Sequence, residues 1–128
     1  MNETAAGGCL CGAVRYQVER PLRDVILCHC EMCRKTHGHI GAYTAAPKGA
    51  LRIVEARGLK WYASSPGIRR GFCGECGGTL FWERVERDII SIAAGTLDSP
   101  TGLHTTLQIY ADSAGDYYDI DANIPVRT

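Results

Sequence analysis

The sequence lacks several features that would point to particular classes of protein. It carries no net charge, since 14 lysine and arginine residues balance 14 acidic residues, and so lacks the long-range field that nucleic-acid binders and membrane-surface proteins use. No apolar run approaches the ~20 residues that a membrane helix needs. The glycine-rich phosphate-binding motifs and the G-x-S-x-G motif of serine hydrolases are also missing. We therefore expect small molecules or proteins as partners, with no nucleic acid and no membrane.

The opening stretch, MNETAAGGCLCG, has neither the basic cluster nor the apolar core of a secretory signal. A cytoplasmic location is therefore the expectation. In that reducing compartment the seven cysteines of the chain are poor material for disulfides but good metal ligands. Their odd number points the same way.

Hydrophobic patterning predicts one mostly-β domain over residues 1–128, built from two packed antiparallel sheets. Long helical stripes are missing, and 15 glycines and five prolines separate short runs of β-branched and aromatic residues. We expect the acidic tail after Tyr110 to pack irregularly or to form a loop that closes over a site. The predicted strands cover residues 13–18, 25–27, 39–45, 51–54, 59–63, 68–72, 79–82, 89–93 and 107–110.

Four cysteines form two close pairs, Cys9 with Cys11 and Cys73 with Cys76. Structural zinc takes four thiolates in a tetrahedron at ~2.3 Å. In an extended strand Cys9 and Cys11 would point to the same face, and glycines around the C-x-x-C pair let its backbone curl around an ion. We predict a structural zinc site here. The alternatives at Cys73 and Cys76 are a redox dithiol, which would normally open a helix after a strand, and a pair of buried unliganded thiols.

The other three cysteines, Cys28, Cys30 and Cys33, lie close together in the stretch LCHCEMCRK. Three protein ligands and an open fourth position are typical of a reactive zinc rather than a structural one. Three thiolates would leave the ion with a net charge near −1, which suits activation of an added thiol better than activation of water. We predict a second, catalytic zinc at this cluster. An iron-sulfur cluster is the alternative, although the usual ferredoxin spacings are absent.

His29 lies between two of these cysteines, and in an extended backbone it points to the opposite face from both. As a fourth ligand it would close the site. It is otherwise a hydrogen-bonding group, a proton carrier or a half-buried side chain. Nearby cations, Arg34 and Lys35, or Arg69 and Arg70, could neutralise an anionic centre or hold a carboxylate of an incoming thiol. The alternative for each is a solvated surface charge.

Four segments in this order, GGCLCGAVRY, CHCEMCRKTHG, IRRGFCGECGGTLFW and AAGTLDSP, resemble the glutathione-dependent formaldehyde-activating enzyme family, whose domain is shared with centromere protein V. The resemblance implies a mostly-β fold with one zinc on each of the two cysteine groups. It also implies that formaldehyde and glutathione are joined to S-hydroxymethylglutathione, a carbon-sulfur lyase activity written in reverse. Family members known for this activity are longer, and a histidine-isoleucine pair common in the family is Gln108-Ile109 here.

The leading hypothesis is a zinc enzyme in which Cys28, Cys30 and Cys33 hold the metal that receives a small thiol, glutathione or a relative, for addition to formaldehyde or another small aldehyde. His29 or water would supply the proton to the product oxygen. The alternative is a non-catalytic zinc module with two structural sites. A zinc-ribbon nucleic-acid binder is disfavoured by the zero net charge and by the lack of a basic, aromatic-lined stripe.

Overall fold

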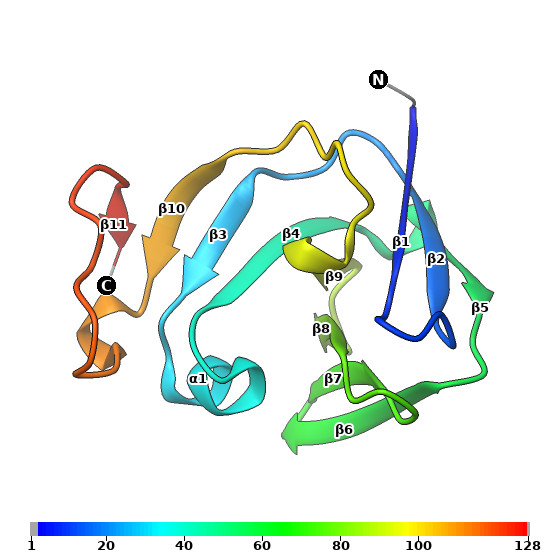
Figure 1. Ribbon diagram of the computed structural model, residues 1–128, viewed down its shortest axis with the longest axis horizontal. Helices are drawn as coiled ribbons and strands as arrows, with labels where there is room; N and C mark the ends of the chain where they lie inside the picture. Colours follow the sequence, from blue (N-terminus) through cyan, green and yellow to red (C-terminus); the bar gives the residue numbers. More distant parts are fainter. Residues whose placement is uncertain (1–2, 128) are drawn as a thin grey trace.

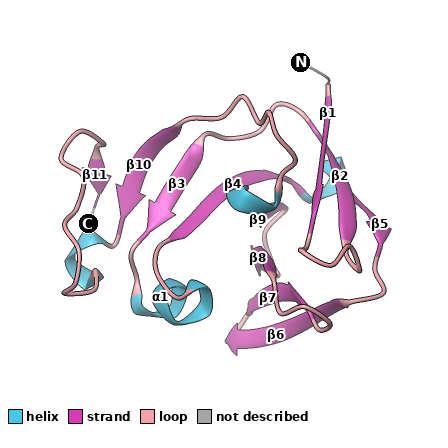
Figure 2. Ribbon diagram, viewed as in Figure 1, coloured by secondary structure: helices cyan, strands magenta, loops and turns pink. Residues whose placement is uncertain are grey.

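The computed structural model describes residues 3–127 and consists of two sheets (Figures 1 and 2). The smaller sheet has the strand order β1-β2-β5, and the larger has the order β11-β10-β3-β4-β9-β8-β7-β6. The smaller sheet contains β1 (Thr4–Gly8), β2 (Arg15–Glu19) and β5 (Leu51–Glu55). The larger contains β3 (Val25–Cys28), β4 (Gly41–Pro47), β6 (Leu59–Ser65), β7 (Ile68–Cys73), β8 (Thr79–Arg84), β9 (Ile89–Ala93), β10 (Thr105–Ile109) and β11 (Val126–Arg127). The mostly-β prediction with two sheets is confirmed.

The larger sheet is antiparallel from β3 to β6, but its other edge is parallel. Strand β10, which the chain reaches by a long connection from β9, pairs in parallel with β3, and after a second irregular segment β11 pairs in parallel with β10. In Figure 1 the sheet curves from β11 at the left to β6 at the bottom. The chain after β10 is irregular up to β11, as expected for the acidic tail, apart from a single turn at Ala111–Ser113.

All nine predicted strands are present with shifts of a few residues at their ends, whereas two strands and one helix escaped prediction. Strand β1, with the sequence TAAGG, has no β-branched residue after its first position and so gives no propensity signal. Helix α1 (Glu31–His37) has only seven residues, too few for a hydrophobic stripe. Its ends did carry a signal, since Gly38 closes it in the left-handed conformation at φ 78°.

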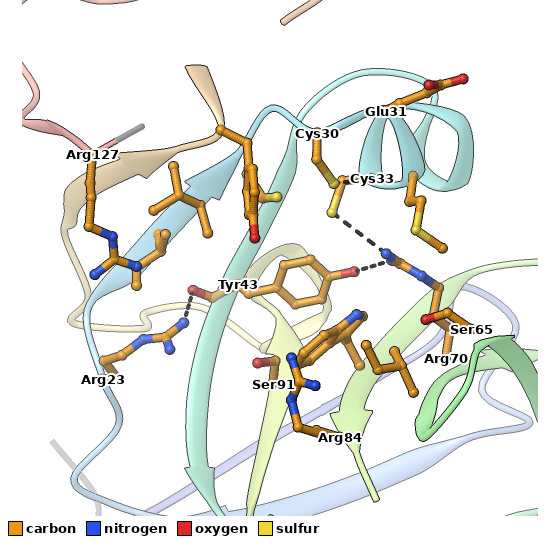
Figure 3. Close-up of a pocket in the computed structure, with 17 residues that line it drawn as sticks. Arg23, Cys30, Glu31, Cys33, Tyr43, Ser65, Arg70, Arg84, Ser91 and Arg127 are labelled. Atoms are coloured by element: carbon orange, nitrogen blue, oxygen red, sulfur yellow. Dashed lines mark hydrogen bonds between the residues drawn. The ribbon is translucent and has the colours of Figure 1, made fainter. Parts of the chain in front are cut away.

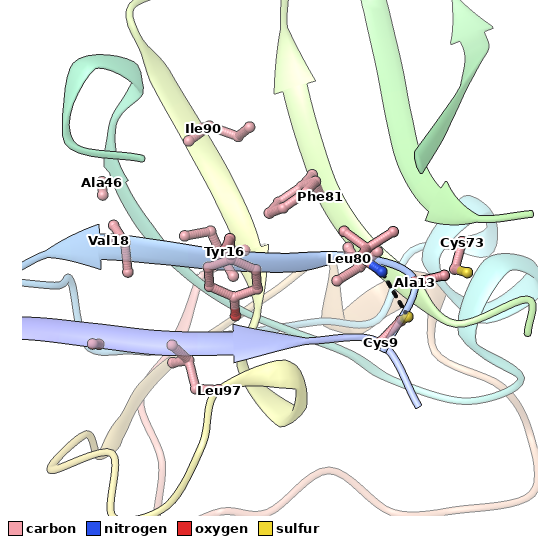
Figure 4. Close-up of a cluster of buried hydrophobic side chains, with 13 residues drawn as sticks. Cys9, Ala13, Tyr16, Val18, Ala46, Cys73, Leu80, Phe81, Ile90 and Leu97 are labelled. Carbon is pink, nitrogen blue, oxygen red and sulfur yellow. Dashed lines mark hydrogen bonds between the residues drawn. The ribbon is translucent and has the colours of Figure 1, made fainter. Parts of the chain in front are cut away.

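The main core lies between the two sheets (Figure 4). Tyr16 and Val18 of β2 pack toward Phe81 of β8 and Ile92 of β9, and these four side chains are at most 1% exposed. The rings of Tyr16 and Phe81 meet edge to face with centroids 5.5 Å apart. Each such side chain contributes about 1.5–3 kcal/mol on burial. Cys9 and Cys73 belong to this core, whereas Cys28 and Cys33 pack in a second, smaller cluster with Tyr43 and Ala93.

In residues 3–127, no helix has the length and apolar composition that crossing a membrane would require. Helix α1 is the one α-helix of this part of the chain. Three further single turns, at Lys48–Ala50, Ala94–Thr96 and Ala111–Ser113, are 3₁₀ in type.

Candidate metal centres

Two hairpins bring the four paired cysteines together. Cys9 and Cys11 lie in the loop between β1 and β2, Cys73 ends β7, and Cys76 lies in the turn to β8. Their four sulfur atoms all lie within 4.8 Å of one another. The Cys9–Cys11 and Cys11–Cys73 sulfur separations are both 3.7 Å. Ligands at ~2.3 Å around a tetrahedral zinc are about 3.8 Å apart, so the spacing of the sulfurs fits this ion.

The local backbone explains how each hairpin presents its sulfurs. The expectation that Cys9 and Cys11 lie in an extended strand is wrong. They lie in a tight loop, where the Val14 N–H donates to the Cys9 sulfur at 3.3 Å. In the other hairpin Gly77 adopts φ 78° and donates its N–H to the Cys73 carbonyl oxygen at 2.8 Å. This conformation favours glycine, so the predicted curl of the C-x-x-C segment depends on Gly77.

Helix α1 and the end of β3 assemble the second group. Cys28 ends β3, Cys30 caps the helix, and Cys33 lies in its first turn. The Cys30 sulfur accepts a hydrogen bond from the Cys33 N–H at 3.3 Å, which is the ordinary geometry of an N-cap side chain. The three sulfurs lie within 4.8 Å of one another. The N-cap and the first helical turn thus bring three thiols from six consecutive positions close together.

Each group contains at least one thiol whose pKa is lowered, which suits metal ligation because the ligand must be deprotonated. The Cys28 thiol, and after it Arg70, lower the pKa of Cys33 to about 6. The backbone N–H groups of Gly78 and then Cys11 lower the pKa of Cys76 to about 6. All seven cysteines are free of disulfides. Both groups could therefore hold a metal ion.

The ring nitrogens of His29 have partners other than the three sulfurs. His29 is 1% exposed; its Nε2 donates to Gln108 Oε1 at 2.9 Å, and its Nδ1 lies 2.6 Å from the Tyr118 hydroxyl oxygen. Both ring nitrogens are thereby engaged. Gln108 also donates to the Asp121 carbonyl oxygen at 2.9 Å. His29 and Gln108 therefore connect the tail to the segment that carries Cys28 and Cys30. It is not among the residues whose donor atoms gather at the three-thiol group.

Arg70 is the cation that reaches the three-thiol group. Its side chain comes from β7, is 6% exposed, and places Nη2 3.8 Å from the Cys33 sulfur. Its Nη1 donates to the Tyr43 hydroxyl at 3.4 Å. The neighbouring Arg69 turns the other way and pairs with Glu83 at 2.6 Å. Of the four arginine and lysine residues considered from the sequence, Arg70 alone is recorded in contact with a sulfur of this group in the described chain.

A cavity of about 510 Å³ opens beside Cys28, Cys30 and Cys33 (Figure 3). Its apolar wall includes Ile26, Ile68, Trp82 and Ile109. The charged groups in its lining are four arginines and one acid, namely Arg23, Arg70, Arg84, Arg127 and Glu31.

Sequence spacing gave no indication of Tyr43, Arg23, Arg84 or Arg127 as lining residues. Tyr43 lies in β4, Arg84 ends β8 and Arg127 lies in β11, and their proximity results from the strand order of the larger sheet. The alternation of β4 indicated only that Tyr43 would face one side of a sheet. His37 and His39 bond to tyrosine hydroxyls at 2.5 and 2.7 Å and belong to neither cysteine group.

Comparison with known proteins agrees with this arrangement. The sequence pattern of the glutathione-dependent formaldehyde-activating enzyme family matches residues 4–113, a stretch that includes both cysteine groups. The chain belongs to this family. Its membership accounts for the order of the cysteine motifs along the sequence and makes a lyase-type enzyme the coarse assignment.

One relative of this family member is an uncharacterized lyase of Schizosaccharomyces pombe, 29% identical over 117 residues, which are 88% of this chain and 82% of the relative. A crystal structure of a Rhodobacter sphaeroides protein superimposes with a TM-score of 0.64 at 22% identity, covering 95% of this chain and 99% of the other. This second likeness supports the fold alone.

Proposed function

We propose that this chain is a zinc-dependent carbon-sulfur lyase-type enzyme that adds a small thiol, glutathione or a relative, to formaldehyde or another small aldehyde. In this proposal Cys9, Cys11, Cys73 and Cys76 hold a structural zinc, and Cys28, Cys30 and Cys33 hold the catalytic one. The observation that carries the proposal is that the three-thiol group lines a cavity, whereas the four-thiol group supplies as many sulfurs as a structural zinc requires. When bound at three thiols, zinc supplies the capacity to keep an added thiol deprotonated at neutral pH.

The charges of the cavity support a carboxylated thiol. The cavity lining contains four arginines and one acidic residue, although the chain as a whole has no net charge. Arg84 enters the cavity lining from the end of β8. Arginine binds carboxylates with two parallel hydrogen bonds. The cavity therefore offers one end to a sulfur and another to a carboxylate, as a peptide-like thiol requires.

Two further parts of the proposal concern location and the alternative. The seven free cysteines are compatible with a reducing compartment, so we retain the cytoplasm as the proposed location.

The competing function, a non-catalytic module with two structural zincs, requires a fourth protein ligand at the second metal. His29 is the nearest candidate in sequence, and its two ring nitrogens already have other partners.

The test combines a metal count with a condensation assay. Wild type is expected to contain two zinc ions per chain, and Cys30→Ser one, with an unchanged circular dichroism spectrum. Wild type should accelerate adduct formation between glutathione and formaldehyde over the protein-free rate, and Cys30→Ser should not. Glutathione diethyl ester, which lacks both negative carboxylates, should be a poor substrate. Two fully protein-ligated zincs by X-ray absorption, together with no acceleration, would instead establish the module.

A further inference from the structure

The Arg70 guanidinium is a buried cation that has no carboxylate partner among residues 3–127. At 6% exposure it contacts a sulfur and a phenol oxygen, and its Nε atom has no hydrogen-bond partner in residues 3–127. Burying a charge without compensation is costly. The contact with the Cys33 sulfur provides part of the compensation. The remaining contact, to the Tyr43 hydroxyl, fixes that group at the cavity wall (Figure 3).

The Tyr43 oxygen is held from two sides. Arg70 can only donate, so the oxygen accepts from Nη1 at 3.4 Å. His37 Nε2 also lies 2.5 Å from this oxygen, with the two rings edge to face at 74°. When Nε2 carries the imidazole proton, both lone pairs of the Tyr43 oxygen are occupied. The Tyr43 O–H proton then remains available for a ligand in the cavity that Tyr43 lines.

We propose that Tyr43 is a catalytic residue of this centre whose hydroxyl donates a hydrogen bond to the aldehyde oxygen, and that Arg70 and His37 are its positioning residues. The inference rests on the proposed function. The sulfur electron pair forms the C–S bond, the C=O π pair moves to oxygen, and that oxygen receives the proton that the thiol gave up. Negative charge grows on the oxygen during this step, and a preorganised donor stabilises it.

The geometry favours Tyr43 over His29 for this task. Tyr43 lines the cavity together with Cys28, Cys30 and Cys33. Its hydroxyl and the Cys33 sulfur contact the same guanidinium, so donor and thiol site lie on the same side of the cavity. His29 does not line the cavity, and its ring nitrogens bond to Gln108 and Tyr118.

The first test compares Tyr43→Phe with Tyr16→Phe. Tyr16 is a matched control because its hydroxyl is also in a largely buried site, bonded to Thr96 at 2.7 Å, but in the core between the sheets. Removing one oxyanion donor typically lowers kcat by roughly 10²–10³. We expect Tyr43→Phe to lose most of the enzymatic acceleration, with KM for glutathione and the zinc content unchanged. Tyr16→Phe should retain activity. A Tyr43→Phe enzyme with wild-type kcat would overturn the inference and leave the proposed function standing.

A binding cycle tests the same contact without catalysis. Isothermal titration would compare S-(2-hydroxyethyl)glutathione with S-ethylglutathione, which differ in one hydroxyl. We expect wild type to favour the hydroxyl ligand by roughly five- to tenfold, the contribution of one hydrogen bond, and Tyr43→Phe to lose this preference. Equal preference in both proteins would refute the Tyr43 contact. If the preference holds but wild type gives no acceleration, the contact stands and the proposed reaction fails.

The positioning role of Arg70 is tested by non-additivity. Arg70→Met should lower kcat about as much as Tyr43→Phe, and the double variant should be little worse than either single one, because both changes remove the same donor. Arg70→Lys, which keeps the charge, should restore part of the rate. Fully multiplicative losses at equal zinc content would show that Arg70 acts independently of Tyr43.

Discussion

Replacing Gly58 by alanine should abolish metal binding at the four-cysteine site without touching a ligand. A Cβ atom at Gly58 would lie 2.6 Å from the Cys73 sulfur and 2.9 Å from the Ala13 Cβ atom. The backbone cannot retreat easily, since the Gly58 N–H donates to the Ala13 carbonyl oxygen at 2.9 Å and the Gly58 carbonyl oxygen accepts from Gly74 at 2.7 Å. Gly58 thus lies between the two hairpins that carry the ligands.

The size of the effect follows from these distances. The sulfur must move by about 0.8 Å to reach the edge of ordinary contact at 3.4 Å, whereas metal-ligand distances tolerate only about 0.2 Å. Overpacking alone costs about 1–3 kcal/mol, or roughly 4–12 °C in melting temperature for a chain of this size. Loss of a structural zinc would lower stability further, because the energy of binding is part of the energy of folding.

The assay is the zinc content of the purified protein together with its melting temperature. We expect about one zinc per chain in Gly58→Ala, against two in the wild type. Gly49→Ala is the control, since no atom lies within 4 Å of a Cβ atom built there. If Gly58→Ala keeps two zincs and melts within about 2 °C of Gly49→Ala, the reasoning from sulfur displacement is wrong.

Three other variants test the core, the pH dependence and the role of His29. Phe81→Ala, at a position with 0% exposure, should cost about 3–5 kcal/mol in urea unfolding, and a cost below 1 kcal/mol would contradict its place in the core. Burial raises the pKa of Tyr16 to about 12, so the contribution of Tyr16 to stability is present below pH 10 and is lost as the pH rises toward 12. Tyr16→Phe should therefore reduce the loss of stability with pH in alkaline unfolding curves. An unchanged slope would refute this role of Tyr16. Gln108→Leu removes the partner of His29 Nε2 and should cost about 1–3 kcal/mol with zinc content unchanged; loss of zinc would make His29 part of the metal site.

The prediction of elements succeeded where strands carry β-branched or aromatic residues, and it failed where they do not. β8, with the sequence TLFWER, was found to within two residues, while β1, made of small residues, was missed. β1 is a strand because it pairs with β2 along its full length, and pairing with a partner is not visible in a segment's own composition.

For the candidate site, the sequence grouped the seven cysteines as four and three, and the structure brings together the same two groups. Short spacing keeps Cys9 near Cys11, Cys73 near Cys76, and Cys28, Cys30 and Cys33 together, because residues a few positions apart in sequence cannot move far from one another. The joining of Cys9 and Cys11 to Cys73 and Cys76 across the chain was inferred from ligand number alone. The predicted local geometry of Cys9 and Cys11, an extended strand, was wrong, because these residues lie in a loop.

By itself the sequence determined the class of fold, the family and the three close clusters of cysteines, because these depend on residue types at short spacing. The tertiary structure decided that Cys9 and Cys11 meet Cys73 and Cys76. Only the tertiary structure decided what faces the three thiols. Tyr43 and Arg70 are 27 positions apart in sequence, and Arg84 and Arg127 come from other strands of the same sheet. Which of these side chains share a cavity depends on strand order and register, where a shift of one residue would turn each to the opposite face.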